Sequence, residues 1–126
     1  MVYKFLFWLY LFNAILIINH EIESAYWKEW ELFKLPGGIS FFLILHFPIL
    51  FIILLGLHLV YNKSYGGLII SLILGCGGLF AFGIHTFFIK RGHESFNLPI
   101  SSFMLRGTLA LSIIQIILSL YLLLMI

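Results

Sequence analysis

Charged residues are scarce in this sequence. Only 10% of its 126 residues are Asp, Glu, Lys or Arg, whereas 63% are hydrophobic and the mean hydropathy is +1.14. In soluble domains about a quarter of the residues are charged, because their surfaces must be hydrated. The deficit argues against an ordinary soluble domain and predicts an integral membrane protein that sits in a lipid bilayer.

Basic clusters and cysteine pairs are lacking as well. The 7 basic and 5 acidic residues give a net charge of +2 and form no basic block, so nucleic acid is not expected as a partner. The single cysteine, Cys76, cannot form a disulfide within the chain, so it does not indicate a redox compartment. Because Cys76 lies inside an apolar run, we expect it to be a small buried apolar residue.

Long apolar runs are abundant. A helix needs about 20 apolar residues to cross a bilayer, and four segments meet this requirement: residues 2–23, 39–60, 67–89 and 100–126. Their short connections predict antiparallel neighbours, and hence an all-α, four-helix transmembrane bundle with residues 1–126 as a single domain. We interpret the first run as a retained span, because Glu23 occupies the place where a signal cleavage site needs a small residue.

The connector between the first two spans predicts a short helix at the membrane interface. Trp27, Trp30 and Phe33 recur every three residues, and tryptophan prefers the depth of the lipid headgroups. Three charged residues of this connector are expected to form a solvated face: Glu29, Glu31 and Lys34.

Histidines gather on one side of the predicted membrane. His20 ends the first span, His46 lies about two turns inside the second, and His85 lies about a turn from the end of the third. Antiparallel packing brings all three to the side opposite the chain ends, together with His93, whereas His58 belongs to the other side. Lysine and arginine are more numerous on the histidine side, so the positive-inside rule predicts that it faces the cytoplasm of a bacterial-type inner membrane.

Helical phase predicts which polar residues share a face. A stripe on the first span holds Asn13, His20, Glu23, Trp27 and Trp30; one on the third holds Ser71, Gly75, Gly78, Phe82 and His85; one on the fourth holds Thr108, Ser112, Gln115 and Ser119. Polar residues in a membrane are costly and face the bundle interior, and glycines let another helix approach closely. We therefore expect these stripes to face inward.

A metal site is the sharpest interpretation of the histidines. His20 and Glu23 are three residues apart on one helical face, so their side chains can share an ion. The candidate ligands are His20, Glu23, His46 and His85, with His93 as a further ligand or a residue that orients one. Imidazole and carboxylate suit zinc, iron or manganese, and an open site could serve a metal-dependent enzyme acting on a lipid-soluble substrate. Glu21, about 100° away from the stripe, is the candidate catalytic base.

Other interpretations use the same residues. Histidines near helix ends can be interfacial, and Glu23 can pair with Lys28 or Arg106. His46 and His85 at one depth could ligate a b-type haem. The glycine-rich third span could pack against a larger membrane protein or a second copy of the chain, which would make the chain a non-catalytic accessory subunit. Bound metal, a haem absorbance band or a co-purifying protein would distinguish these possibilities.

Two family resemblances begin at His20. The run His20-Glu21-Ile22-Glu23 resembles the His-x-x-Glu-Glu signature of the HXXEE family, small multi-pass bacterial membrane proteins that are supposed to bind metal. Ser24 stands where that signature has its second glutamate. The longer run from His20 to Phe33, with the turn at 35–39, is similar to an uncharacterised bacterial family of four-helix membrane proteins, which implies the four-span fold and no particular activity.

Overall fold

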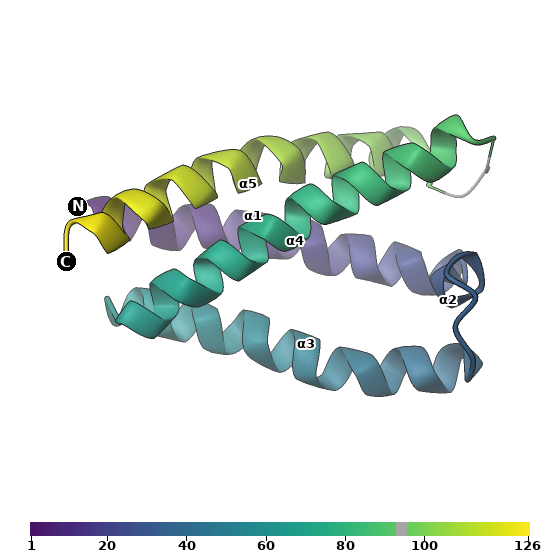
Figure 1. Ribbon diagram of the computed structural model, residues 1–126, viewed down its shortest axis with the longest axis horizontal. Helices are drawn as coiled ribbons and strands as arrows, with labels where there is room; N and C mark the ends of the chain where they lie inside the picture. The colour runs from purple at the N-terminus through teal and green to yellow at the C-terminus, as the bar shows by residue number, and fades with distance from the viewer. Residues whose placement is uncertain (93–95) are drawn as a thin grey trace.

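A computed structural model describes residues 1–92 and 96–126, and these residues form helices without strands. The helices are α1 (Val2–Tyr26), α2 (Glu29–Leu32), α3 (Gly38–Tyr61), α4 (Tyr65–Lys90) and α5 (Pro99–Leu124) (Figure 1). All but the short α2 are long and apolar enough to cross a membrane. The predicted all-α, four-helix membrane bundle is confirmed, as is the presence of a short helix between the first two spans.

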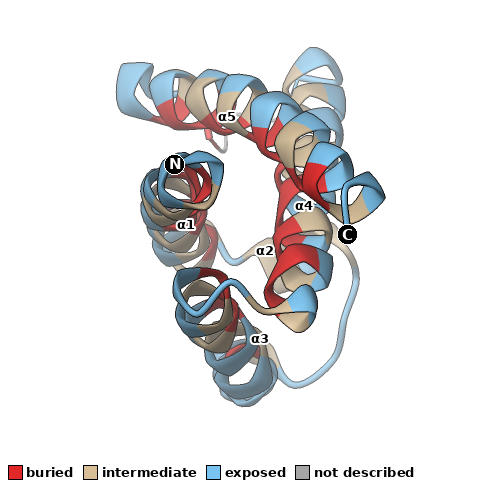
Figure 2. Cartoon of the chain, turned by 90° about the vertical axis from the view of Figure 1, so that its left-hand side faces the viewer, coloured by how far each residue is buried: buried red, intermediate tan, exposed pale blue. Residues whose placement is uncertain are grey.

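Buried polar side chains join α1, α4 and α5 at the centre of the bundle. The Asn13 amide nitrogen donates to Ser112 Oγ at 3.0 Å and to Gln115 Oε1 at 2.9 Å, and Asn13 Oδ1 accepts from Thr108 Oγ1 at 2.7 Å. The Gln115 amide in turn donates to the Ser71 carbonyl at 2.9 Å. The end-on view shows the buried residues turned toward the common centre (Figure 2). The polar stripe predicted on the fourth span therefore faces inward.

The glycine stripe of α4 is covered by α5. A Cβ atom at Gly78 would lie 2.0 Å from Ser112 Oγ, and one at Gly75 would lie 2.7 Å from Ile116 Cγ1. These glycines are needed for contact within the chain, which accounts for the stripe without a partner protein. Cys76, next to Gly75, is exposed on the outer face of the bundle, so the expectation that it is buried was wrong. An apolar outer face is stable in lipid, so an apolar run alone does not indicate burial.

α3 and α4 are close together at their hairpin and diverge toward the opposite end (Figure 1). Near the hairpin, Gly67 packs directly on the backbone of α3. A little farther along, the Tyr10 hydroxyl of α1 donates to the Ile53 carbonyl of α3 at 2.6 Å. The divergence leaves space between α1, α3 and α4, and the chain before α3 closes over its far end.

The close contact at Gly67 leads to a stability prediction. A Cβ at Gly67 would lie 2.6 Å from the Leu59 carbonyl carbon and 2.6 Å from the Val60 nitrogen, and backbone atoms cannot rotate away. We expect Gly67→Ala to lower the free energy of unfolding by about 1–3 kcal/mol, measured by thermal or detergent-induced unfolding. Gly77→Ala is the control, because among the described residues nothing beyond its own stretch of helix lies within 4 Å of its Cβ position. Equal stability of the two variants would contradict this close contact.

Candidate metal centre

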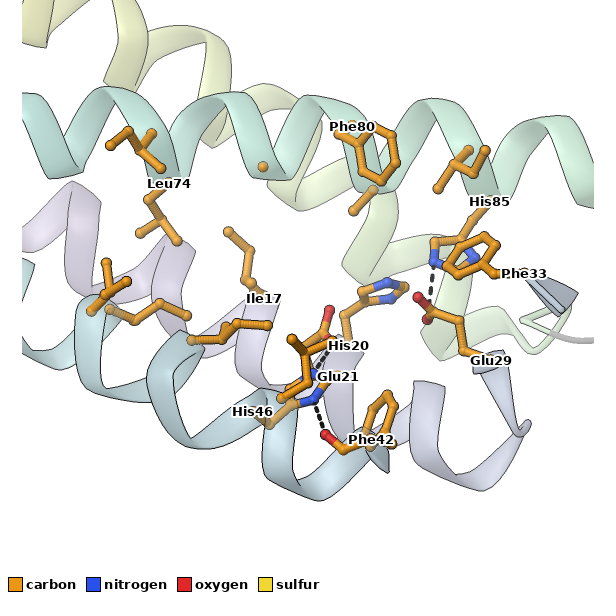
Figure 3. A pocket seen from close by; sticks show the side chains of 18 of the residues that line it. Ile17, His20, Glu21, Glu29, Phe33, Phe42, His46, Leu74, Phe80 and His85 are labelled. Atoms are coloured by element: carbon orange, nitrogen blue, oxygen red, sulfur yellow. Dashed lines mark hydrogen bonds and ion pairs between the residues drawn. The ribbon is translucent and has the colours of Figure 1, made fainter. Parts of the chain in front are cut away.

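The space between the diverging helices is a pocket of about 400 Å³. Most of its lining is aliphatic or aromatic, contributed by α1, α3 and α4 (Figure 3). Its histidine and carboxylate side chains gather at the end away from the α3–α4 hairpin: His20, Glu21, Glu29, His46 and His85. The pocket therefore combines a long apolar part with a small group of titratable residues.

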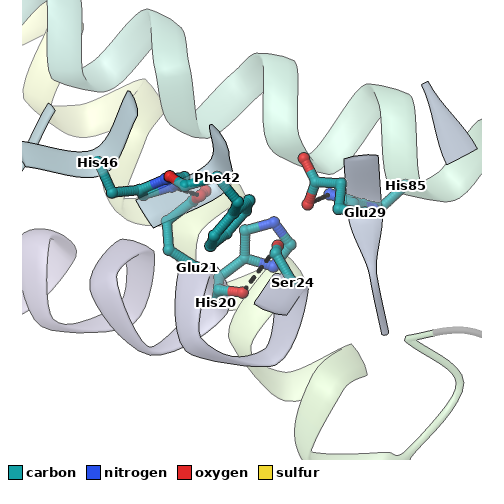
Figure 4. Close-up of polar contacts among 7 residues, drawn as sticks. All are labelled: His20, Glu21, Ser24, Glu29, Phe42, His46 and His85. Atoms are coloured by element: carbon teal, nitrogen blue, oxygen red, sulfur yellow. Dashed lines mark hydrogen bonds and ion pairs between the residues drawn. The ribbon is translucent and has the colours of Figure 1, made fainter. Parts of the chain in front are cut away.

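His20, Glu29 and His85 come together from three different helices at this polar end. Each offers one ligand atom, and the three atoms lie within 4.8 Å of one another. His85 Nε2 is 3.5 Å from Glu29 Oε2 (Figure 4), and the His20 and His85 rings meet edge to face with centroids 4.4 Å apart. About 3.3 Å separates two ligand atoms held about 2 Å from a tetrahedral zinc ion. Small side-chain rotations would bring the group to that spacing, so the cluster could hold a metal ion.

The same three residues carry buried polar atoms without hydrogen bonds. His20 is 3% exposed and His85 is 1% exposed. Neither ring's Nδ1 has a hydrogen-bond partner, and Glu29 Oε2 has none. Within residues 1–92 and 96–126, the one other buried side-chain atom in this state is Glu23 Oε1. Buried polar groups without partners are rare in proteins, so three of them in one cluster indicate that polar groups there lack a partner within the protein.

The electrostatics at Glu29 also favour a cation. Burial raises the pKa of the Glu29 carboxyl; the Ser24 hydroxyl and His46 partly oppose this effect, and Glu21 adds to it. A positive ion beside a carboxylate favours its charged form. A bound metal would therefore relieve the cost of burying this charge.

Phe96 covers the cluster on the side of α5. It is 2% exposed, and its ring centroid lies 4.1 Å from that of His85 and 5.4 Å from that of His20. Its backbone has a positive φ of 63°, which is uncommon for a bulky residue. The conformation places the ring over both imidazoles and restricts their movement.

Glu21 and His46 form a separate pair in the same pocket. Glu21 Oε2 lies 2.5 Å from His46 Nε2, and His46 Nδ1 lies 2.7 Å from the Phe42 carbonyl oxygen (Figure 4). A carbonyl oxygen can only accept, so Nδ1 carries a hydrogen and donates it. Both nitrogens of His46 are therefore engaged. Ligation of a metal or of a haem iron by His46 would require breaking one of these contacts.

Comparison of the sequence with known protein families identifies one family, whose function is unknown. A model described as a family of unknown function, DUF6713, matches residues 6–122. The chain belongs to the DUF6713 family. No curated protein and no solved structure matches it. Membership agrees with the resemblance to an uncharacterised family, and the site in this DUF6713 chain must be interpreted from its own chemistry.

The structure distributes the predicted ligands among different contacts. Glu23 turns toward α5, where its carboxylate accepts hydrogen bonds from Ser101 Oγ and, at 3.1 Å, from Trp27 Nε1. His20 and His85 lie in the cluster, whereas His46 binds Glu21. His93 lies outside the described residues.

Glu29 is the member of the cluster that we did not predict from the sequence. We expected it on a solvated face, but its side chain is 15% exposed and points into the pocket (Figure 3). The reason is that aromatic contacts fix the position of α2. The Trp30 ring packs on the Phe42 ring of α3, with centroids 5.5 Å apart. The Phe33 ring packs on the Phe88 ring of α4, with centroids 5.9 Å apart. Glu29 and Phe33 are four residues apart and share a helical face. This spacing could have indicated that Glu29 follows Phe33 inward.

Proposed function

We propose that this chain is a metal-binding membrane protein in which His20, Glu29 and His85 hold one transition-metal ion. The proposal rests on the meeting of three ligand atoms within 4.8 Å, one from each of α1, α2 and α4. The orphaned buried nitrogens of both histidines support it. Two imidazoles and one carboxylate suit zinc, iron(II) or manganese.

We further propose that the site is catalytic. Three protein ligands leave a coordination position open, which is typical of catalytic rather than structural zinc sites. The pocket beside the cluster is largely apolar, which suits a lipid-soluble substrate. A metal at this position would polarise a substrate carbonyl or activate water. Glu21, which lines the same pocket beside His46, is the candidate base.

The proposed location of the site is the cytoplasmic face of a bacterial-type plasma membrane. The described residues on the cluster side include Lys28, Lys34, Lys90 and Arg91, whereas Lys4 and Lys63 lie toward the other side. Cytoplasmic segments are enriched in lysine and arginine. Labelling of single-cysteine variants from each side of sealed vesicles tests this orientation.

Metal analysis of the purified full chain tests the proposed function. Detergent-solubilised protein is stripped with a chelator, given zinc, iron(II) or manganese separately, and freed of excess ion. Three ligands predict retention of about one ion per chain for at least one metal. A folded protein that retains none of the three would contradict the proposal.

Glu23 provides a prediction that separates this ligand set from the one suggested by sequence spacing. Its carboxylate is engaged by Ser101 and Trp27, so we expect Glu23→Ala to keep the metal content of the natural chain. Losing these hydrogen bonds should lower the free energy of unfolding by about 1–3 kcal/mol. The control is Glu31→Ala, which alters an exposed residue of α2. Loss of metal from folded Glu23→Ala would instead favour His20 and Glu23 as ligands.

A further inference from the structure

The pocket has an apolar length that metal binding does not use. From Phe42 to Ile53 it follows about 16 Å of α3, at 1.5 Å per residue. Its walls over this length are largely aliphatic and include Ile49 of α3. Leu74 of α4 lies on the facing side (Figure 3). Toward the hairpin the lining includes Tyr10 and Ile53, where the Tyr10 hydroxyl donates to the Ile53 carbonyl. The pocket is thus an apolar slot with the candidate metal cluster at its polar end.

The slot opens sideways, between α3 and α4. Residues that line it are also exposed on the outer surface: Leu45 and Ile52 of α3 are 42% and 44% exposed, and Ile73 and Phe80 of α4 are 58% and 66% exposed. Both helices are long and apolar enough to cross a membrane. In a bilayer this opening faces lipid tails, so molecules dissolved in the membrane can enter without crossing water.

The chemistry of the slot favours one kind of occupant. Its lining is apolar along α3 and ends in titratable side chains at one end. A membrane-crossing helix is about 10 Å across and apolar along most of its length, so it does not match this polarity. A single hydrocarbon chain with a polar head does, because it also has one long apolar part and one polar end.

We propose that the slot binds one fatty-acyl chain taken from the bilayer, with its carbonyl or carboxyl oxygen at the polar end. The proposal rests on the proposed function for its head group, because that oxygen takes the open position on the metal held by His20, Glu29 and His85. Carboxylate and carbonyl oxygens are ligands for such ions. The hydrocarbon tail lies along the aliphatic walls toward Ile53, where van der Waals contacts with those walls replace its contacts with bilayer lipid. The substrate class is thus a single-chain acyl lipid.

Photolabelling with a diazirine-bearing palmitic acid tests this site. The probe is added to the metal-loaded full chain in detergent, irradiated, and its adducts are mapped by mass spectrometry. We expect adducts on the slot-lining residues of α3 and α4, and competition by unlabelled palmitic acid but not by hexadecane.

Two glycines of α4 give a matched pair of variants. Gly77 lines the slot and Gly83 does not. In the part of the chain that the structure describes, a Cβ at either position meets nothing within 4 Å beyond its own stretch of helix. Gly77→Phe fills the slot and should reduce labelling by at least about tenfold. Gly83→Phe adds the same side chain outside the slot and should leave labelling unchanged. Both variants should retain metal, which shows that the bundle is intact.

The outcomes separate the two proposals. Labelling scattered over the outer surface, or equal labelling of the Gly77 and Gly83 variants, would overturn the acyl-chain site even in a chain that binds metal. Labelling that appears only after a dimer is dissociated would assign the opening to a second copy and also overturn it. Slot labelling that is sensitive to Gly77→Phe in a chain that retains no metal would support the acyl-chain site and overturn the metal proposal alone.

Discussion

Replacing His85 by alanine is expected to weaken metal binding by at least about a hundredfold. His85 is almost fully buried, and its ring supplies one of the three ligand atoms of the cluster. Even residues that only orient a ligand typically cost 10–100-fold in metal affinity when they are removed. Loss of a ligand itself should reduce the metal affinity by a larger factor. Competition with a chromophoric chelator of known affinity measures the change in dissociation constant.

Two further variants make the His85 result specific. His20→Ala removes a ligand from a different helix and should give a loss of the same order. His58→Ala is the control, because His58 is exposed and contacts Asn62 at the other end of α3. Helicity and elution volume in detergent verify that each variant is folded. Unchanged affinity in both His85→Ala and His20→Ala would rule out the proposed ligand set.

The second large effect is expected at Asn13, in the centre of the membrane bundle. Leucine at this position has a similar size but makes none of the three hydrogen bonds to α5. Bonds between membrane helices contribute about 0.6 kcal/mol on average and up to about 1.7 kcal/mol, so three give about 2–5 kcal/mol. We expect Asn13→Leu to lower the free energy of unfolding by this amount, measured by titration with a denaturing detergent.

The same substitution at an exposed asparagine provides the control. Asn62 follows the end of α3 and contacts His58 there. Asn62→Leu should change stability by less than about 0.5 kcal/mol, as surface substitutions usually do. If Asn13→Leu is as stable as Asn62→Leu, the polar network does not hold α1 to α5.

Most of the fold could be predicted from residue periodicity. Both ends of each predicted span lie within three residues of the ends of the corresponding helix. The agreement arises because crossing a bilayer requires a long apolar run that is visible in the sequence. Ser112 and Gln115 were assigned to an inward stripe because polar groups avoid lipid, and both are fully buried. These properties depend on local sequence and on the solvent, so one chain suffices to predict them.

Two of the three residues in the candidate metal cluster could be predicted, whereas the third depends on how the chain turns. His20 and Glu23 are about 60° apart around the helix axis. That difference is enough for His20 to face α4 while Glu23 faces Ser101 on α5. Lys28 then adopts a left-handed conformation with φ 54°, and the chain folds back so that Glu29 enters the pocket. The reversal of the chain at Lys28 determines where the Glu29 side chain points. Helical spacing within the first span carries no information about this reversal.

X-ray absorption at the zinc edge of the zinc-loaded protein tests whether His20, Glu29 and His85 form the metal centre. We expect a first shell of two imidazole nitrogens at about 2.0–2.1 Å with carboxylate or water oxygens at about 2.0–2.2 Å, and no sulfur. One imidazole should disappear from this shell in His85→Ala. A first shell without imidazole, or one unchanged in His85→Ala, would contradict a metal centre built from His20, Glu29 and His85.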